Sequence, residues 1–353
     1  MIHFPSAARA FATTVDCSRA STDDVKRVRR QRANFALLIR RAITAVLLGT
    51  SAAWLPGSLA MAAPPVATPV AVEPPGRTAG SPRQPTVQWA ASWPRFRPSE
   101  YVVTGGLGIA TWYLDRHRSP PPAPKWRGGI VFDDALRGWL RSDTREGRER
   151  AGKVSDAFWL GGSAVPFLVD LPVALLAHRQ PRVAWQLLMM DLEAYAVAGF
   201  INRSLHFTVG RGRPGLADCA ADPGYDRLCG DPANNASFPS GHTLGVATAA
   251  GLTCVHHRYL PLYGGPVLDG GACGVMVAAT AVTAVTRIMA DRHHGTDVIA
   301  GAAIGFASGY SIPWLLHYRQ RGENGERRSA TGGAVMVPYG GANELGLGVV
   351  GTL

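Results

Sequence analysis

Charged residues and cysteines are both scarce in this chain of 353 residues. Charged residues make up 17 % of the sequence and apolar residues 46 %, which is too apolar and too poor in charge for a disordered protein. Five cysteines are too few for a disulfide-stabilised scaffold, and no Cys/His spacing is typical of a zinc site. The length allows one large domain or two small ones with a real hydrophobic core.

The excess of basic residues lies mainly in the first 62 residues. Nine basic and three acidic residues there carry +6 of the formal net charge of +11. They precede an apolar run at 42–55, a helix-breaking Pro56-Gly57 pair and small residues at 60–62. This order is typical of an export signal, and an uncleaved N-terminal anchor is the alternative interpretation. Since basic residues are not interleaved with aromatics on the remaining chain, the sequence predicts no nucleic-acid binding.

Pro-rich and polar stretches divide the rest of the chain. Residues 63–99 contain seven prolines within 22 residues and predict a semi-extended linker. Residues 100–157 combine a first apolar segment with a polar loop. Within that loop, residues 132–140 predict a short amphipathic helix, which either lies on a membrane surface or packs on the core. Residues 158–318 form the main predicted domain, and residues 319–353 form a C-terminal tail.

Apolar segments dominate the predicted body. They are residues 101–114, 158–177, 183–205, 243–256, 272–287 and 298–317. Several approach the ~20 residues that span a bilayer, and small residues such as Gly301, Gly305 and Gly309 suit close helix packing. We therefore expect an all-α bundle of about six core helices, with membrane-spanning helices favoured over soluble core helices. A disordered N-terminal region is expected before the bundle, and residues 334–337 and 345–350 predict a small β-like element in the tail.

Three polar clusters interrupt the apolar segments, each at the end of a predicted helix. They are Arg211-Gly212-Arg213-Pro214, Phe238-Pro239-Ser240-Gly241-His242, and the stretch from Arg287 through His293 to Asp297. Arginine guanidinium groups match phosphate oxygens with paired donors. The N–H groups at the start of a helix present the favourable end of its dipole to an anion. Together the clusters supply the groups that phosphoryl transfer needs.

The spacing within the clusters also predicts roles for the two histidines. His293 and Asp297 are four residues apart, which places them side by side on a helix or helical turn. The carboxylate can then hold one ring nitrogen as N–H and leave the other free to attack phosphorus. His242 belongs to a different cluster and is free to protonate the leaving oxygen.

The three clusters resemble the type 2 phosphatidic acid phosphatase and vanadium haloperoxidase superfamily. Its pattern is Lys-x6-Arg-Pro, then Pro-Ser-Gly-His, then Ser-Arg-x5-His-x3-Asp. Arg213-Pro214, residues 239–242 and the set Arg287, His293 and Asp297 match it in order and spacing. His206 stands where the family has Lys, and Thr286 stands where it has Ser. Because His206 is positively charged only when protonated, we expect an acidic optimum.

The resemblance implies that residues 158–318 are a metal-independent phosphatase domain that needs no cofactor, with vanadate as a phosphate-mimicking inhibitor. Its catalytic residues would be His293 as nucleophile, Asp297 as the group that orients it and His242 as general acid. Its phosphate-binding residues would be Arg213, Ser240, Gly241, Arg287 and His206. The substrate would be a lipid phosphate or isoprenoid pyrophosphate, because the site opens from a largely apolar bundle.

The implied setting is a bacterial-type inner membrane, with the active site facing the periplasm or exterior. Three alternatives share the motifs: a soluble periplasmic non-specific acid phosphatase, a vanadium-dependent haloperoxidase, and an inactive membrane protein on a phosphatase-like scaffold.

Four cysteines flank two loops of the predicted bundle. Cys219 and Cys229 lie either side of a Pro-Gly loop between the first two clusters, and in an exported protein they could close a disulfide over the site. Cys254 and Cys273 flank the loop 258–271, which lies on the opposite face if the adjoining helices span a membrane. In that case we expect only one pair to be oxidised, and two disulfides would favour a periplasmic globular enzyme.

Overall fold

The structure is a computed structural model that describes residues 87–319, 335–341 and 344–350. The predicted export signal or anchor, the predicted disorder of the N-terminal region and most of the Pro-rich linker lie outside the described residues.

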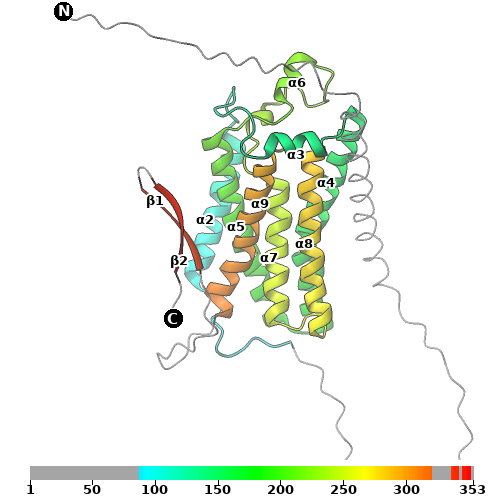
Figure 1. The fold of residues 1–353 in the computed structure, drawn as a ribbon. Helices are drawn as coiled ribbons and strands as arrows, with labels where there is room; N and C mark the ends of the chain where they lie inside the picture. Colours follow the sequence, from blue (N-terminus) through cyan, green and yellow to red (C-terminus); the bar gives the residue numbers. More distant parts are fainter. Residues whose placement is uncertain (1–86, 320–334, 342–343, 351–353) are drawn as a thin grey trace, which may run out of the picture.

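Six long helices of the described chain run alongside one another as a bundle (Figure 1). They are α2 (Pro98–His117), α4 (Arg145–Val165, extended by the π-helical turns Pro166–Asp170 and Val173–Ala177), α5 (Pro181–Val209), α7 (Gly241–Tyr259), α8 (Pro266–Met289) and α9 (Gly295–Pro313, extended by the π-helical turn Trp314–Tyr318). The short helices α3 (Asp133–Leu140) and α6 (Leu216–Ala221) lie at one end of the bundle, and Pro232–Asn235 forms a 3-10 turn. The predicted all-α bundle of about six core helices is confirmed.

The predicted β-like element in the tail is a two-stranded hairpin. Strand β1 (Val335–Gly341) pairs antiparallel with β2 (Glu344–Val350), so that Val335 lies opposite Val350.

Helix α4 begins 13 residues before the apolar segment that predicted it. Its start is fixed by Thr144, whose hydroxyl oxygen accepts a hydrogen bond from the Gly147 N–H at 3.1 Å. The polar residues 145–157 are therefore helical, and they bring charged side chains over the end of the bundle where α3 and α6 lie.

Glycines on α9 allow α7 to approach it closely. A Cβ at Gly301, Gly305 or Gly309 would lie 2.1–2.5 Å from a carbonyl oxygen of the chain between Ser240 and Thr248. These glycines are four residues apart and share one face of α9, so a larger side chain at any of them would push the helices apart. The contact sets the start of α7 beside the start of α9, where two of the three polar clusters lie.

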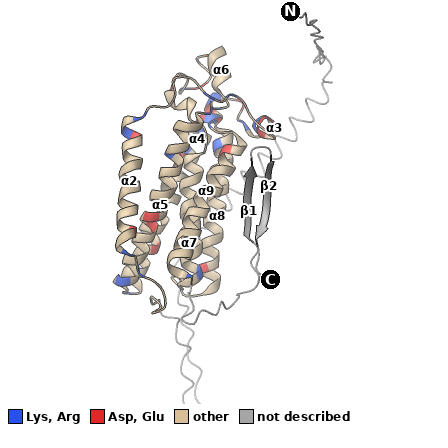
Figure 2. Ribbon diagram, turned by 90° about the vertical axis from the view of Figure 1, so that its left-hand side faces the viewer, with Lys and Arg blue, Asp and Glu red and all other residues tan. Residues whose placement is uncertain are grey.

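The outer faces of the bundle are apolar. Ile109 is 68 % exposed, Leu168 72 % and Val267 84 %, and charged residues gather mostly at the two ends (Figure 2). Among the described helices, three are long and apolar enough to cross a membrane: Arg145–Ala177, Pro266–Met289 and Gly295–Tyr318. These features indicate membrane association.

The structure contains two disulfides, Cys219–Cys229 and Cys254–Cys273. The expectation that only one pair is oxidised is therefore wrong. The second bridge does not lie in the 258–271 loop but one to two turns inside α7 and α8, and Cys254 is only 7 % exposed. Because Cys254 is buried between the helices and only Cys273 is partly exposed, this bridge is a weaker indicator of the compartment at that end than a bridge in an open loop.

Candidate active site

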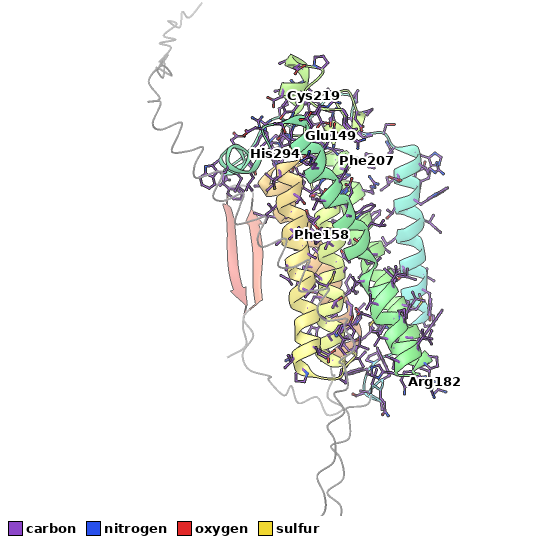
Figure 3. The ribbon with its side chains drawn as sticks, turned by 90° about the vertical axis from the view of Figure 1, so that its right-hand side faces the viewer. Glu149, Phe158, Arg182, Phe207, Cys219 and His294 are labelled. Atoms are coloured by element: carbon purple, nitrogen blue, oxygen red, sulfur yellow. A yellow bond between two sulfur atoms is a disulfide. The ribbon has the colours of Figure 1, made fainter. Side chains whose placement is uncertain are left out.

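The fold brings the three polar clusters together at one end of the bundle. The Ser240 N–H donates to the Asp297 carbonyl at 3.0 Å, and the Ser237 N–H donates to the Arg211 carbonyl at 2.8 Å. His294, which precedes α9, lies at the same end as Cys219 and opposite Arg182 (Figure 3). Residues more than 80 positions apart in the sequence thus share one site.

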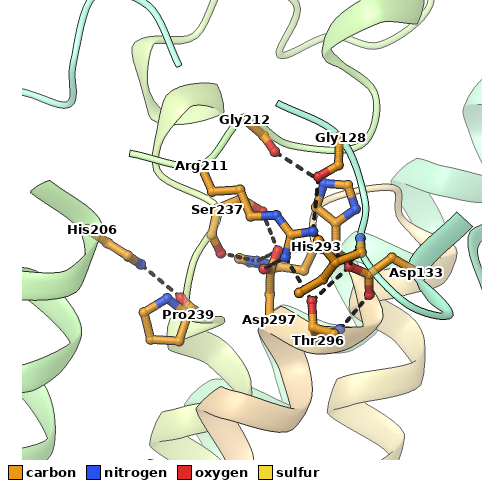
Figure 4. A network of polar contacts seen from close by, with 12 residues as sticks. Gly128, Asp133, His206, Arg211, Gly212, Ser237, Pro239, His293, Thr296 and Asp297 are labelled. Atoms are coloured by element: carbon orange, nitrogen blue, oxygen red, sulfur yellow. Dashed lines mark hydrogen bonds and ion pairs between the residues drawn. The ribbon is translucent and has the colours of Figure 1, made fainter. Parts of the chain in front are cut away.

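His293 is held with one ring nitrogen free. Its Nδ1–H donates to the Ser237 carbonyl at 2.8 Å, which leaves Nε2 as the nitrogen with a lone pair (Figure 4). The Asp297 carboxylate lies 3.8 Å from Nδ1. Burial, together with the charges of Arg287 and Arg213, lowers the pKa of His293 to about 3, against the opposing effect of Asp297. The ring is therefore neutral at pH 7, as a nucleophile must be.

Asp297 is fixed by several donors at once. Its Oδ1 accepts from Arg211 at 2.6 Å, and its Oδ2 accepts from the Ser237 hydroxyl at 2.6 Å and from the His294 N–H at 2.9 Å (Figure 4). The carboxylate therefore acts on His293 mainly as a nearby negative charge, while the Ser237 carbonyl sets the orientation of the ring.

Arg211 is a fully buried ion-pair partner. Its guanidinium bonds Asp133 at 2.7 Å as well as Asp297, and it lies 4.0 Å from the centre of the Trp126 ring. Asp133, at the start of α3, also accepts from the Thr296 N–H at 2.7 Å. Arg211 thus ties α3 to the start of α9, and both of its terminal nitrogens are engaged in this network. Only its buried Nε lacks a partner among the described residues.

Arg213 differs sharply from its neighbour Arg211. Within the described part of the chain its guanidinium makes no hydrogen bond or ion pair, and its Nε is buried without a partner. Burial and the charge of Arg292 lower its pKa to about 10, so it remains protonated at neutral pH. Arg213 is half-buried as a residue, and a guanidinium whose Nε is buried without a partner is costly unless an anion binds beside it.

Arg287 is a second arginine at the site whose Nε is buried without a partner, although its Nη1 is engaged. It is 6 % exposed, and its Nη1 lies 3.2 Å from the Ser155 hydroxyl and 3.5 Å from the Asp156 carboxylate, while its Nε has no partner among the described residues. Arg213 and Arg287 repel one another. Two positive charges therefore act on the neutral His293 ring.

The start of α7 supplies the remaining anion-binding groups. Ser240 precedes the helix and is fully buried, with its hydroxyl 3.0 Å from that of Thr243. Gly241 and His242 occupy the first turn, whose N–H groups have no acceptor within the helix.

His242 points toward α4. Its Nε2 lies 2.9 Å from the Asp156 carboxylate, and its ring lies 4.9 Å from the Trp159 ring. Burial and the charge of Arg287 lower the pKa of His242 to about 4, and Asp156 opposes this shift. At pH 7 only a small fraction of His242 therefore carries a proton, and Asp156 increases that fraction.

Residues 188–321 match the model of the PAP2 superfamily. This part of the chain belongs to the PAP2 superfamily. The matched segment contains every motif residue of the three clusters. Comparisons with curated proteins and with solved structures gave no match.

The PAP2 segment is completed by residues that lie outside the matched range. Ser155 and Asp156 come from α4, and Asp133 comes from α3. No sequence pattern indicates these residues, because they belong to no motif and lie 78–132 positions from their partners. Ser237 lay one residue before the second cluster, and only its position next to the motif could have indicated a role.

His206 occupies the lysine position of the PAP2 pattern but has a partner of its own. Its Nε2–H donates to the Pro239 carbonyl at 2.9 Å, just before the start of α7. Burial lowers the pKa of His206 to about 4, so the ring is neutral at pH 7. It holds the second motif in place through this bond, and the Nδ1 of the neutral ring is an acceptor, so it has no N–H to donate to a phosphate oxygen. Thr286, the other departure from the PAP2 pattern, uses its hydroxyl within its own helix, where it donates to the Val282 and Thr283 carbonyls.

A cavity of about 540 Å³ adjoins the PAP2 site. It is lined by Arg213 and His294 on one side, by residues of the 122–129 loop on another, and by Leu216, Ala217 and Ala220 of α6. The Cys219–Cys229 bridge closes the loop that carries α6, so it fixes one wall of this cavity. In the described residues no group of three or more His, Cys, Asp or Glu side chains is arranged to hold a metal ion.

Proposed function

We propose that the chain is a phosphatase that hydrolyses a phosphate monoester or pyrophosphate of a lipid or isoprenoid through a phosphohistidine intermediate. The observation that carries this proposal is a pair of guanidinium groups, those of Arg213 and Arg287, each with a buried and unpartnered Nε, beside a neutral histidine with a free ring nitrogen. PAP2 membership suggests phosphatase-type activity in general.

The first step of the mechanism is an in-line attack. The His293 Nε2 lone pair forms a bond to phosphorus as the bond from phosphorus to the leaving oxygen breaks, and His242 gives that oxygen its proton. Arg213, Arg287, Ser240 and the N–H of Gly241 bind the phosphate oxygens and stabilise the charge that develops on them. Asp297 stabilises the positive charge that forms on the His293 ring.

The second step regenerates the enzyme. His242, now neutral, takes a proton from a water molecule whose oxygen attacks phosphorus, and the bond between phosphorus and Nε2 breaks. Phosphate leaves, His293 is neutral again and His242 is protonated. No oxidant or other co-reactant is needed.

Phosphate release from a panel of phosphorylated lipids tests the reaction class and the substrate. We expect turnover of at least one member among phosphatidate, undecaprenyl pyrophosphate, phosphatidylglycerol phosphate and lipid A. EDTA should leave the rate unchanged, and vanadate should inhibit because it mimics the phosphoryl group. Chelator-sensitive hydrolysis, or bromination that depends on vanadate in place of phosphate release, would contradict the proposal.

Replacing Asp156 by Asn should change the pH dependence more than the affinity. Without the carboxylate, His242 loses its proton at lower pH, so the alkaline limb of kcat/KM moves to more acidic values. At pH 7 the rate should fall roughly tenfold, as expected for a neighbouring opposite charge. Glu149→Gln on the same helix is the matched control, since Glu149 pairs with Arg145. An unshifted profile in the Asp156 variant would exclude this role.

We propose that the site faces the exterior of the membrane. The Cys219–Cys229 bridge supports this orientation, because both cysteines are partly exposed and an accessible disulfide persists only in an oxidising compartment. Intact cells that produce the chain should hydrolyse a membrane-impermeant aryl phosphate as fast as lysed cells. Activity that appears only after lysis would place the site on the inner face.

A further inference from the structure

A second cavity, of about 560 Å³, lies where the chain enters α2 and the first turn of α5 begins. The residues that line it include Arg95, Arg182, Val183, Trp185 and Gln186. Arg182 lies at the end of the bundle opposite His294, so this cavity is separate from the catalytic site (Figure 3). None of the residues that line it is acidic.

The side chains around this cavity offer hydrogen-bond donors without partners. Gln186 is only 8 % exposed, and its Oε1 accepts from the Phe96 N–H at 2.7 Å. No other described group bonds its amide nitrogen, which therefore keeps two N–H donors at the cavity wall. Arg95 and Arg182 have no ion pair with any residue that the structure describes. The cavity thus presents unpartnered donors and two arginines, with no carboxylate in its lining.

The start of α5 adds to this positive field. The helix is 29 residues long and begins at Pro181, and the N–H groups of Arg182 and Val183 precede its first intrahelical bond. The positive end of the helix dipole therefore faces the same space as the two guanidinium groups. An anion with several oxygen acceptors matches this arrangement.

Aromatic residues place the cavity at the level of a membrane surface. Trp185 is 49 % exposed, and its indole N–H donates to the hydroxyl of Tyr101, which is 39 % exposed. The next residues of α2, Val102 and Val103, are 75 % and 52 % exposed. Half-exposed Trp and Tyr beside outward-facing aliphatic side chains are typical of the boundary between headgroups and acyl chains.

We propose that this cavity binds the phosphate of an anionic phospholipid headgroup at the end of the bundle opposite the catalytic site. Arg95, Arg182 and the Gln186 amide bind the phosphate oxygens, and the acyl chains follow the apolar face of α2. The proposal depends on the bundle lying in a bilayer and not on the reaction at His293.

Thermal unfolding in lipid nanodiscs tests this proposal. The full chain should unfold at a higher temperature in phosphatidylglycerol than in phosphatidylcholine. The double variant Arg95→Gln/Arg182→Gln and the single variant Gln186→Glu should each lose most of this difference. Gln186→Glu keeps the acceptor for Phe96 and replaces only the donor. Aryl phosphate hydrolysis by these variants should stay within about twofold of the rate of the unchanged chain, since the substituted residues lie at the end of the bundle opposite the catalytic site.

The double variant Arg179→Gln/Arg258→Gln is the matched control. It removes the same charge from two exposed arginines that do not line the cavity. An equal loss of the lipid effect in this control would overturn the proposal, because the effect would then be one of surface charge. An unchanged lipid effect in the cavity variants would overturn it as well.

Inorganic phosphate, added in phosphatidylcholine nanodiscs, separates a lipid from a free anion. Phosphate also binds the catalytic site, so its effect is read as the difference between the unchanged chain and the Arg95/Arg182 variant. No difference supports the lipid assignment. A difference as large as that given by phosphatidylglycerol would assign the cavity to a soluble anion and overturn it.

Discussion

Replacing His293 by Ala should reduce phosphate release by roughly 10⁴-fold or more, because the nucleophile of a covalent mechanism has no substitute. The loss should appear in kcat, with substrate binding retained, since Arg213, Arg287 and the start of α7 remain. Steady-state rates with an aryl phosphate and with the best lipid substrate measure both quantities.

His294→Gln is the matched control for that variant. His294 is the adjacent residue, it is buried, and its Nε2 lies 3.2 Å from the Gly212 carbonyl. A glutamine amide can make the same bond, so activity should stay within about tenfold of the unchanged chain. If the two variants lost activity equally, the loss would reflect disruption of the loop before α9, and His293 would have no special role.

Arg211 and Arg213 should respond to substitution in opposite ways although they are two residues apart. Arg211→Met leaves Asp133 and Asp297 buried without their cation, and breaking a buried ion pair costs about 3–5 kcal/mol. The thermal midpoint of this variant should fall by many degrees. Arg213→Met removes a guanidinium that has no partner among the described residues and that repels Arg287, so stability should be unchanged or higher.

Activity should follow the reverse order. Arg213→Met removes a group that binds the developing charge and should cost roughly 10²–10³-fold in kcat, with the fold intact. Thermal unfolding and aryl phosphate turnover of the two purified variants make the comparison. A stable Arg211 variant, or an Arg213 variant that unfolds early, would contradict the assignment of Arg211 to the ion-pair network and Arg213 to the substrate.

Two local features near the proposed site followed from the sequence. The i, i+4 spacing of His293 and Asp297 placed them within ion-pair distance, and the Ser-Gly-His motif begins a helix as expected. It did not separate Arg211 from Arg213, because both lie in one loop and only the fold decides which of them meets Asp133. It also gave His206 a direct role with phosphate, whereas the structure shows a bond to the Pro239 carbonyl.

Long-range partners were beyond sequence reasoning for a physical reason. Asp156 reaches His242 only because α4 packs against α7, and that packing depends on the shapes of many side chains. The number and type of the long helices followed from apolar segments whose length is a local property. The redox state of Cys254 and Cys273 was predicted wrongly because both were taken to flank a loop, whereas they lie within α7 and α8 and Cys254 is buried.

Direct detection of the phosphohistidine tests the central claim. His242→Ala, mixed with an aryl phosphate whose leaving group needs no proton, should form the intermediate but hydrolyse it slowly. Mass spectrometry of the quenched, digested chain should then find one acid-labile phosphoryl group on the peptide that contains His293, and none in the His242→Ala/His293→Ala double variant. Continued turnover without any phosphoryl group on His293, or the same label in the double variant, would contradict the account.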